Sequence, residues 1–157
     1  MLLKLAHFLH IMLYALVAGV MWGTWLSLGR TMTEYDAATF LADGKHMIAN
    51  LATVMPALMI FTGVVSLIVV ILLFRHGATP PAWLALAALL ALAAVITVTL
   101  AVEVPIDNKT KTWTTATLPA DWEQIRSWWA NFHTLRTFLS LAALAAAIAA
   151  SLARQRP

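Results

Sequence analysis

The sequence contains no cysteine in its 157 residues. This absence excludes disulfide bonds, thiolate metal sites and cysteine nucleophiles, so a metal site would need histidine or carboxylate ligands. Charge is scarce as well, because only 11% of the residues are Asp, Glu, Lys or Arg. The ten basic residues, which leave a formal net charge of +3, are spread thinly along the chain. A nucleic-acid surface would cluster such residues, so we expect no nucleic-acid partner.

Apolar residues are abundant instead: they make up 62% of the chain, and its mean hydropathy is +0.84. A soluble core of this length could not bury so much apolar surface, so the expected solvent is a lipid bilayer. Because each crossing uses about 20 residues, residues 1–157 leave room for a single transmembrane domain. The first apolar run follows Lys4 and continues through Leu28. It has no convincing small-residue cleavage site, and we interpret it as a retained first span.

Four apolar segments are long enough to cross the bilayer. They cover approximately residues 5–28, 47–74, 83–104 and 132–152. The predicted fold class is therefore all-α, a four-helix transmembrane bundle with both termini on one side. Residues 75–81 form a short Gly/Pro turn on that side, whereas the other side carries two long polar loops, at residues 30–45 and 105–131. Only that second membrane face has the groups to build a site.

The distribution of basic residues indicates the orientation. Lys4, Arg75, Arg154 and Arg156 lie on the side of the termini, which carries no acid. Loops that face the cytoplasm carry an excess of Lys and Arg, so we expect both termini in the cytoplasm and the long loops outside. The expected location is a bacterial inner membrane.

Small residues recur every fourth position in span one, at Ala15, Gly19, Gly23 and Ser27. Such a stripe allows close helix approach, so span one is also a candidate homo-oligomer interface. Span four is rich in alanine over residues 142–153 and predicts another tightly packed face.

Three further local features of the sequence predict details of the structure. Residues 33–50 form an amphipathic stretch that we expect to be partly helical and to lie along the membrane surface, with a break at Gly44. Pro105 disfavours helical geometry at Val104 and is expected to end the third helix there. His7 and His10, near the N-terminus, are expected to reach water or lipid headgroups.

Polar residues gather at the outer ends of spans two and three. His46 and Asn50 are four residues apart and so share one helical face. Glu103 precedes Pro105, near the expected membrane boundary. A carboxylate within the membrane is costly unless it is paired or solvated, so Glu103 is either a functional group or an interfacial residue that reaches water.

A second polar group enters span four along one helical stripe. Its spacings are four, three, four and three, and its members are Trp122, Arg126, Trp129, His133 and Arg136. The stripe indicates either the wall of a pocket or an interfacial belt of Trp and Arg. Arg136 lies too deep for the belt, and an unpaired guanidinium there would be expensive, so we expect it to pair with Glu103 or Asp107.

Three classes of function remain open from these residues alone. His46 and His133, with Glu103, could bind a transition metal or a haem, because imidazole and carboxylate are suitable ligands. A second class is an enzyme that uses the same cluster without a metal. The third is a noncatalytic lipid-binding or assembly subunit.

Several short motifs resemble those of one known family. They are Asn50 with Pro56, residues 104–108, Trp113, residues 119–122 and residues 128–136. In pattern and order the chain resembles the anthrone oxygenase family of four-span membrane proteins, many of which have no known function. Asp107 stands where the family pattern often has Asn, and His46 where an amide is more usual.

The resemblance implies oxidation of a polyphenolic anthrone to a quinone by dioxygen, with no metal or organic cofactor. We therefore expect a flat, lipophilic aromatic partner such as a phenol, an anthrone or a hydroquinone. The base would be Glu103, Asp107 or His133, and Arg136 would stabilise the resulting anion. The expected substrate-binding residues supply hydrogen bonds or a flat stacking wall, and they are Asn50, Asn108, Trp128, Trp129 and Asn131.

Overall fold

The computed structural model describes residues 2–153, which form helices and turns without any strand. The α-helices are α1 (Leu2–Thr24), α2 (Ala37–Leu51), α3 (Val54–Arg75), α4 (Thr79–Val98), α5 (Val104–Thr112) and α6 (Trp122–Ala153). Two π-helical turns, η1 (Trp25–Gly29) and η3 (Thr99–Glu103), and one 3₁₀ turn, η2 (Met32–Glu34), interrupt or extend them. The all-α fold predicted from the sequence is confirmed.

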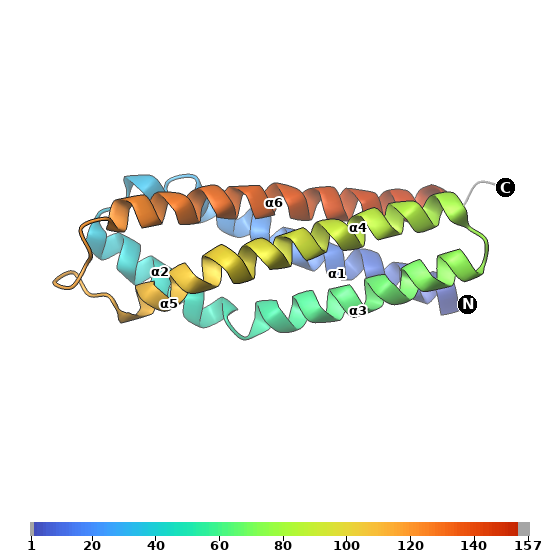
Figure 1. The fold of residues 1–157 in the computed structure, drawn as a ribbon, viewed down its shortest axis with the longest axis horizontal. Coiled ribbons are helices and arrows are strands. Elements are labelled where there is room, and N and C mark those ends of the chain that lie inside the picture. The colour runs from blue at the N-terminus through green and yellow to red at the C-terminus, as the bar shows by residue number, and fades with distance from the viewer. Residues whose placement is uncertain (1, 154–157) are drawn as a thin grey trace.

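Four helical stretches run side by side as an elongated bundle (Figure 1). They cover Leu3–Glu34, Val54–Arg75, Thr79–Thr112 and Trp122–Ala153, and each is long and apolar enough to cross a membrane. α1 begins and α6 ends at the same end of the bundle, where a turn through Gly77 joins α3 to α4. Gly77 has a φ of 67°, a backbone conformation that residues with a Cβ rarely adopt. The predicted four-span architecture is confirmed. The orientation in the membrane stays a prediction, and two of the basic residues on which it depends, Arg154 and Arg156, lie outside the described residues.

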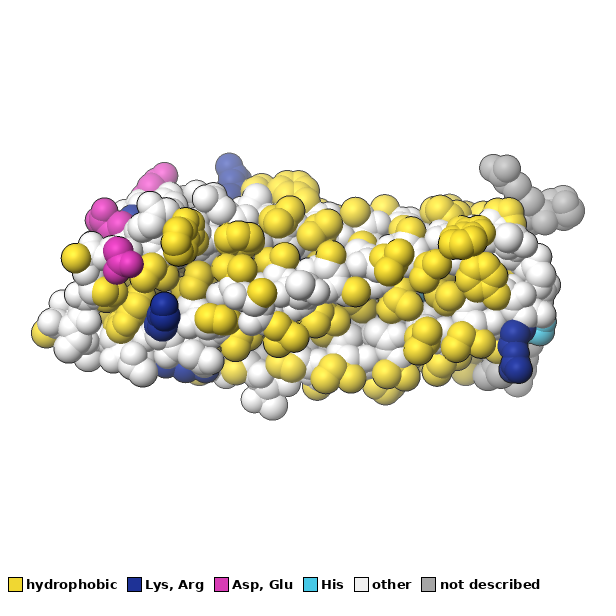
Figure 2. Space-filling model, viewed as in Figure 1, with side chains coloured by type: hydrophobic (Ala, Val, Ile, Leu, Met, Phe, Trp, Pro, Cys, Tyr) yellow, Lys and Arg dark blue, Asp and Glu magenta, His cyan; other side chains and the backbone are white. Residues whose placement is uncertain are grey.

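The long helices exceed the thickness of a bilayer. α6 has 32 residues, which at about 1.5 Å per residue gives roughly 48 Å, against about 30 Å for the hydrocarbon core. Figure 2 shows hydrophobic side chains over the long middle of the molecule, and the acidic side chains visible on this face lie at one end. The end with the acidic residues therefore extends beyond the apolar middle of the bundle, and the candidate site lies toward that end.

Alanines allow α4 and α6 to pack closely. Those with at most 1% of their surface exposed are Ala82, Ala85, Ala88, Ala143, Ala147 and Ala150. The tightly packed alanine face predicted for span four is therefore confirmed. Gly19 and Gly23 behave differently, because both are exposed and no described atom lies within 4 Å of a Cβ placed on either. The small-residue stripe of α1 does not pack inside the bundle, and its role in a homo-oligomer stays a prediction.

The second predicted span is not one continuous helix. The chain turns at Ala52 and Thr53, which separate α2 from α3. Pro56 explains this break, because it has no N–H to donate to Ala52 and its ring crowds that carbonyl group. The predicted break at Gly44 is wrong, since Gly44 lies buried inside α2, where a Cβ would be 3.7 Å from Thr110 of α5.

The third span also departs from the expectation, because the helix does not end at Val104. The π-helical turn η3 leads directly into α5, which places Pro105 in its first turn. A π-helical turn contains one extra residue, so it can accommodate the missing N–H and the bulk of proline without ending the helix. Glu103 is thereby directed into the bundle, where 1% of its surface is exposed.

His7 and His10 are buried in the bundle, which corrects the expectation that they reach water or headgroups. His10 Nε2 lies 3.1 Å from Ser66 Oγ, which also accepts a hydrogen bond of 3.1 Å from the Tyr14 hydroxyl. The His7 ring lies edge-on to His10, with centroids 6.5 Å apart. Because α1 packs against α3 here, the histidines face a neighbouring helix rather than the membrane surface.

A cap built from η2, α2, α5 and the start of α6 closes the end of the bundle opposite the turn between α3 and α4. Asp36 begins α2 by accepting a hydrogen bond of 2.8 Å from the Thr39 backbone N–H, which lowers the pKa of Asp36 below its usual range. Lys45 donates to the Trp113 carbonyl at 2.6 Å, and Arg126 donates to the Tyr35 carbonyl. The apolar interior of the cap comprises Met32, Phe40, Leu41, Ile106, Ile125, Trp129 and Ala130.

Candidate active site

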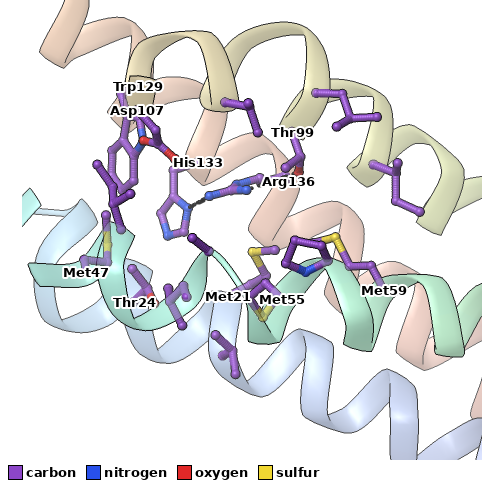
Figure 3. A pocket seen from close by; sticks show the side chains of 18 of the residues that line it. Met21, Thr24, Met47, Met55, Met59, Thr99, Asp107, Trp129, His133 and Arg136 are labelled. Carbon is purple, nitrogen blue, oxygen red and sulfur yellow. Dashed lines mark hydrogen bonds between the residues drawn. The ribbon is translucent and has the colours of Figure 1, made fainter. Parts of the chain in front are cut away.

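A cavity of about 410 Å³ lies below the cap, between the halves of the four long helices that adjoin the cap. Its lining is mostly apolar, with a few polar groups on one side. Figure 3 shows Trp129, Asp107, His133 and Arg136 on that side, while Met21, Met55 and Met59 lie toward the other helices. The lining residues that carry the argument below are Thr99, Asp107, Asn108, Trp129, His133 and Arg136.

Arg136 anchors the polar side of the cavity. Its Nη2 lies 2.8 Å from Glu103 Oε2, which confirms that this guanidinium pairs with an acid at the end of the third span. Arg136 Nη1 also donates to Thr99 Oγ1 at 3.1 Å. Glu103 itself does not line the cavity but lies behind Arg136. The π-helical turn η3 supplies both partners, Thr99 at its start and Glu103 at its end.

The hydrogen bonds of His133 determine what its ring can do. Nδ1 lies 3.3 Å from Arg136 Nε and 3.1 Å from Arg136 Nη2. A guanidinium can only donate, so Nδ1 accepts, and the proton of the neutral imidazole is on Nε2. His133 Nε2 is buried and makes no hydrogen bond of normal length among the described residues, although the ring also interacts with the backbone of Met21. Because Trp129 stacks on the ring with centroids 4.8 Å apart, the ring is held in place and its Nε2–H is left for a ligand.

Asp107 is the carboxylate that faces the cavity. Its Oδ1 accepts a hydrogen bond of 3.2 Å from Trp129 Nε1, and its second oxygen accepts no hydrogen bond from the described residues. Asn108 and Lys111 of α5 lie at the cap end of the cavity, where the Lys111 ammonium donates to Asn108 Oδ1 at 3.1 Å. A hydrogen-bond donor on His133 and an acceptor on Asp107 therefore face the same apolar space.

Four residues expected at the site lie elsewhere. His46 and Asn50 line a second, open pocket of about 370 Å³ together with Asp43. Trp128 is 53% exposed and Asn131 is exposed, both on the outward side of α6. Neighbouring positions on a helix point about 100° apart, so once Trp129 faces inward, Trp128 cannot line the same wall.

The arrangement does not fit the metal hypothesis for His46, His133 and Glu103. Within residues 2–153, no three His, Asp or Glu side chains lie close enough to hold a metal ion. The hydrogen bond from Arg136 to His133 Nδ1 also leaves the proton on Nε2, the atom that would have to bind the metal. These three residues therefore do not form a three-ligand metal site in the described part of the chain.

Several lining residues have no recognisable signal in the sequence. Thr99 lies within an apolar run, and its role depends on the π-helical turn around it. Met21, Met47, Met55 and Met59 line much of the remaining wall, and methionines at helical spacing look like ordinary core residues. The i, i+4 spacing of Met55 and Met59 places both on one helical face, but it does not distinguish the wall of a cavity from an ordinary core.

One side of the cavity is open to the apolar surface of the bundle. Ile60 of α3 and Leu100 of η3 both line it, and they are 66% and 64% exposed. Val104, next along the third span, is also part of the lining and 38% exposed. The cavity is therefore open at the side of the bundle, between α3 and the η3–α5 segment.

The sequence was compared with known protein families, curated proteins and solved structures. A family model described as anthrone oxygenase matches residues 45–146, which include Glu103, Asp107, His133 and Arg136. The match supports an oxygenase-like role at the level of the family. No curated protein and no solved structure matches the chain significantly.

Proposed function

The chain belongs to the anthrone oxygenase family, and from this premise we propose that it oxidises a flat, lipophilic anthrone or related phenol with dioxygen inside the cavity. The observation that carries the proposal is the pairing of a donor, His133 Nε2–H, with an acceptor, Asp107, in an otherwise apolar chamber. Most ligand sites have this composition, an apolar wall with a few convergent polar groups.

The size and position of the cavity suit such a substrate. Its volume of about 410 Å³ lies within the range of about 300–1,000 Å³ that is usual for small-molecule sites. Trp129 provides a flat aromatic surface, and the methionine side chains opposite can adapt to different ring systems. The opening beside Ile60 and Leu100 admits a molecule from the bilayer, where a lipophilic aromatic accumulates.

In the proposed reaction, a methylene group and O₂ give a carbonyl group and water. Asp107 removes a proton from the methylene carbon, and the carbanion gives one electron to O₂. The resulting carbon radical and superoxide combine to form a C–O bond, and Asp107 returns its proton to the peroxide. Removal of the second C–H proton then breaks the O–O bond, forms the C=O bond and releases hydroxide, which leaves as water with that proton.

His133 and Arg136 stabilise the anion formed in the first step. The negative charge of the carbanion is delocalised onto the ring oxygen of the substrate, which accepts the hydrogen bond from His133 Nε2–H. The guanidinium bound to Nδ1 makes this N–H a stronger donor, so Arg136 acts through His133. His133 therefore serves as a donor, and the proposed base is Asp107. Since the substrate anion itself reduces O₂, this scheme requires no metal or organic cofactor.

The direct test is turnover of a dihydroxyanthrone by the purified protein in lipid nanodiscs. We expect the absorbance of the anthraquinone to appear, with one molecule of O₂ consumed for each molecule of substrate. Empty nanodiscs control for spontaneous oxidation. Tight binding of the anthrone without turnover above that control would favour the noncatalytic lipid-binding alternative, and neither binding nor turnover would refute the proposal.

A bulky residue at the lateral opening should hinder access. We expect Ile60→Trp to lower kcat/KM several-fold while kcat changes little, because the substituted side chain narrows the route but does not contact the reacting atoms. Leu67→Trp is the matched control, since Leu67 is also exposed on α3 but does not line the cavity. The measurement is the steady-state rate over a range of anthrone concentrations in nanodiscs. Equal kinetics for the two variants would contradict a lateral route.

A further inference from the structure

We propose that Gly29 positions the His133 imidazole, because it is the residue whose missing side chain leaves room for the ring at the cavity. This inference rests on the proposed function for its effect on catalysis, but the geometry of the ring can be tested separately. Gly29 lies at the end of the π-helical turn η1 and outside the segment matched by the family model.

The contact is specific to one edge of the ring. A Cβ on Gly29 would lie 3.1 Å from His133 Cδ2, closer than ordinary van der Waals contact. Cδ2 is bonded to Nε2, the atom that faces the cavity. Any displacement at Cδ2 therefore moves the N–H that we assign as the hydrogen-bond donor.

The ring has little freedom to avoid the added atom. Trp129 stacks on it with an interplanar angle of 14°, and Arg136 holds Nδ1 through two N–H groups. On the other side of Gly29, the added Cβ would lie 3.4 Å from Trp25 Cδ1. Trp25 is itself fixed, because its Nε1 donates to Thr134 Oγ1 at 3.1 Å. The glycine is thus enclosed by two anchored side chains.

Backbone conformation does not explain the glycine. Gly77 is the glycine with positive φ among the described residues, and Gly29 lies in helical geometry that alanine readily adopts. Gly29→Ala therefore tests the side-chain contact alone. Gly23→Ala is a matched control on α1, since a Cβ at Gly23 has nothing within 4 Å.

The experiment compares wild type, Gly29→Ala and Gly23→Ala in nanodiscs by ¹⁵N NMR of the histidine rings, with His133→Ala used to assign the signals. We expect the wild-type signals of His133 to show hydrogen on Nε2 and none on Nδ1, and Gly29→Ala to shift both. In the same preparations, kcat for the dihydroxyanthrone should fall about 10- to 100-fold in Gly29→Ala with little change in KM, since small misplacements of a catalytic group have effects of this order.

The two measurements test separate claims: that Gly29 positions the His133 ring, and that the protein oxidises the anthrone. Unshifted His133 signals and a wild-type kcat in Gly29→Ala would overturn the positioning role. If wild type itself shows no turnover, the proposed function fails, while the NMR comparison still decides whether Gly29 sets the ring. If Gly29→Ala does not fold, the double variant Gly29→Ala/His133→Ala is measured. Recovery of folded protein is expected because the contact is gone, and failure to recover would assign the effect to Trp25 and overturn the inference.

Discussion

Arg136→Ala is expected to lower the free energy of unfolding by about 3–5 kcal/mol, the usual effect of removing one partner of a buried ion pair. The carboxylate of Glu103 would remain behind with 1% of its surface exposed and without its charge partner. The guanidinium also connects Thr99 to His133, so the loss extends to the donor side of the cavity. Reversible unfolding in mixed micelles measures the change.

A double-mutant cycle identifies the partner. Arg136→Ala combined with Glu103→Gln should cost less than the sum of the single changes, because the second substitution removes the stranded charge. Arg136→Ala combined with Asp107→Asn should be closer to additive, since Asp107 has its hydrogen bond to Trp129 instead. The opposite pattern would mean that Asp107 is the functional partner of Arg136.

Asp107→Asn should lower kcat for anthrone oxidation by about 10²- to 10⁴-fold, the usual contribution of a general base. The amide oxygen can still accept the hydrogen bond from Trp129, so the fold and KM should change little. The measurement is the steady-state rate in nanodiscs, with the spontaneous oxidation subtracted.

Asn108→Ala is the matched control, because Asn108 adjoins Asp107 on α5 and also lines the cavity but cannot act as a base. It should change KM more than kcat. Full activity in Asp107→Asn together with a large loss in Glu103→Gln would instead make Glu103 the base, despite its position behind Arg136.

The physics of the bilayer made much of this fold predictable. A helix that crosses the hydrocarbon core needs about 20 apolar residues, and four such runs are visible in the sequence. The same physics predicted that Arg136 would have an acidic partner, because an unpaired guanidinium within an apolar segment is expensive. Both expectations depend on the free-energy cost of placing a segment or a charge in the membrane, and this cost can be judged from each segment by itself.

The wrong predictions of where helices end or break concern positions at which the packing of neighbouring helices determines the backbone conformation. Pro105 disfavours a helix in isolation, but the π-helical turn before it lets the helix continue and directs Glu103 inward. Pro56, in contrast, does break its helix, and the sequence offered no way to tell the two prolines apart. Whether a chain bends at such a residue depends on the packing available to each alternative.

The site itself was only partly predictable for a related reason. The helical period placed Trp129, His133 and Arg136 on one face, and that face does line the cavity. It could not determine that α2 turns His46 toward a separate pocket. The close approach of Gly29 to His133 joins residues more than 100 positions apart, so no local pattern contains it.

The origin of the oxygen atom added to the product tests the central claim most directly. The dihydroxyanthrone is incubated under ¹⁸O₂ with the protein in nanodiscs, and the anthraquinone is examined by mass spectrometry after subtraction of the empty-nanodisc background. The account predicts that protein-dependent product carries one ¹⁸O atom in its new carbonyl group, while the second atom leaves as water. Product formed with oxygen from water, or no product above the background, would contradict the account.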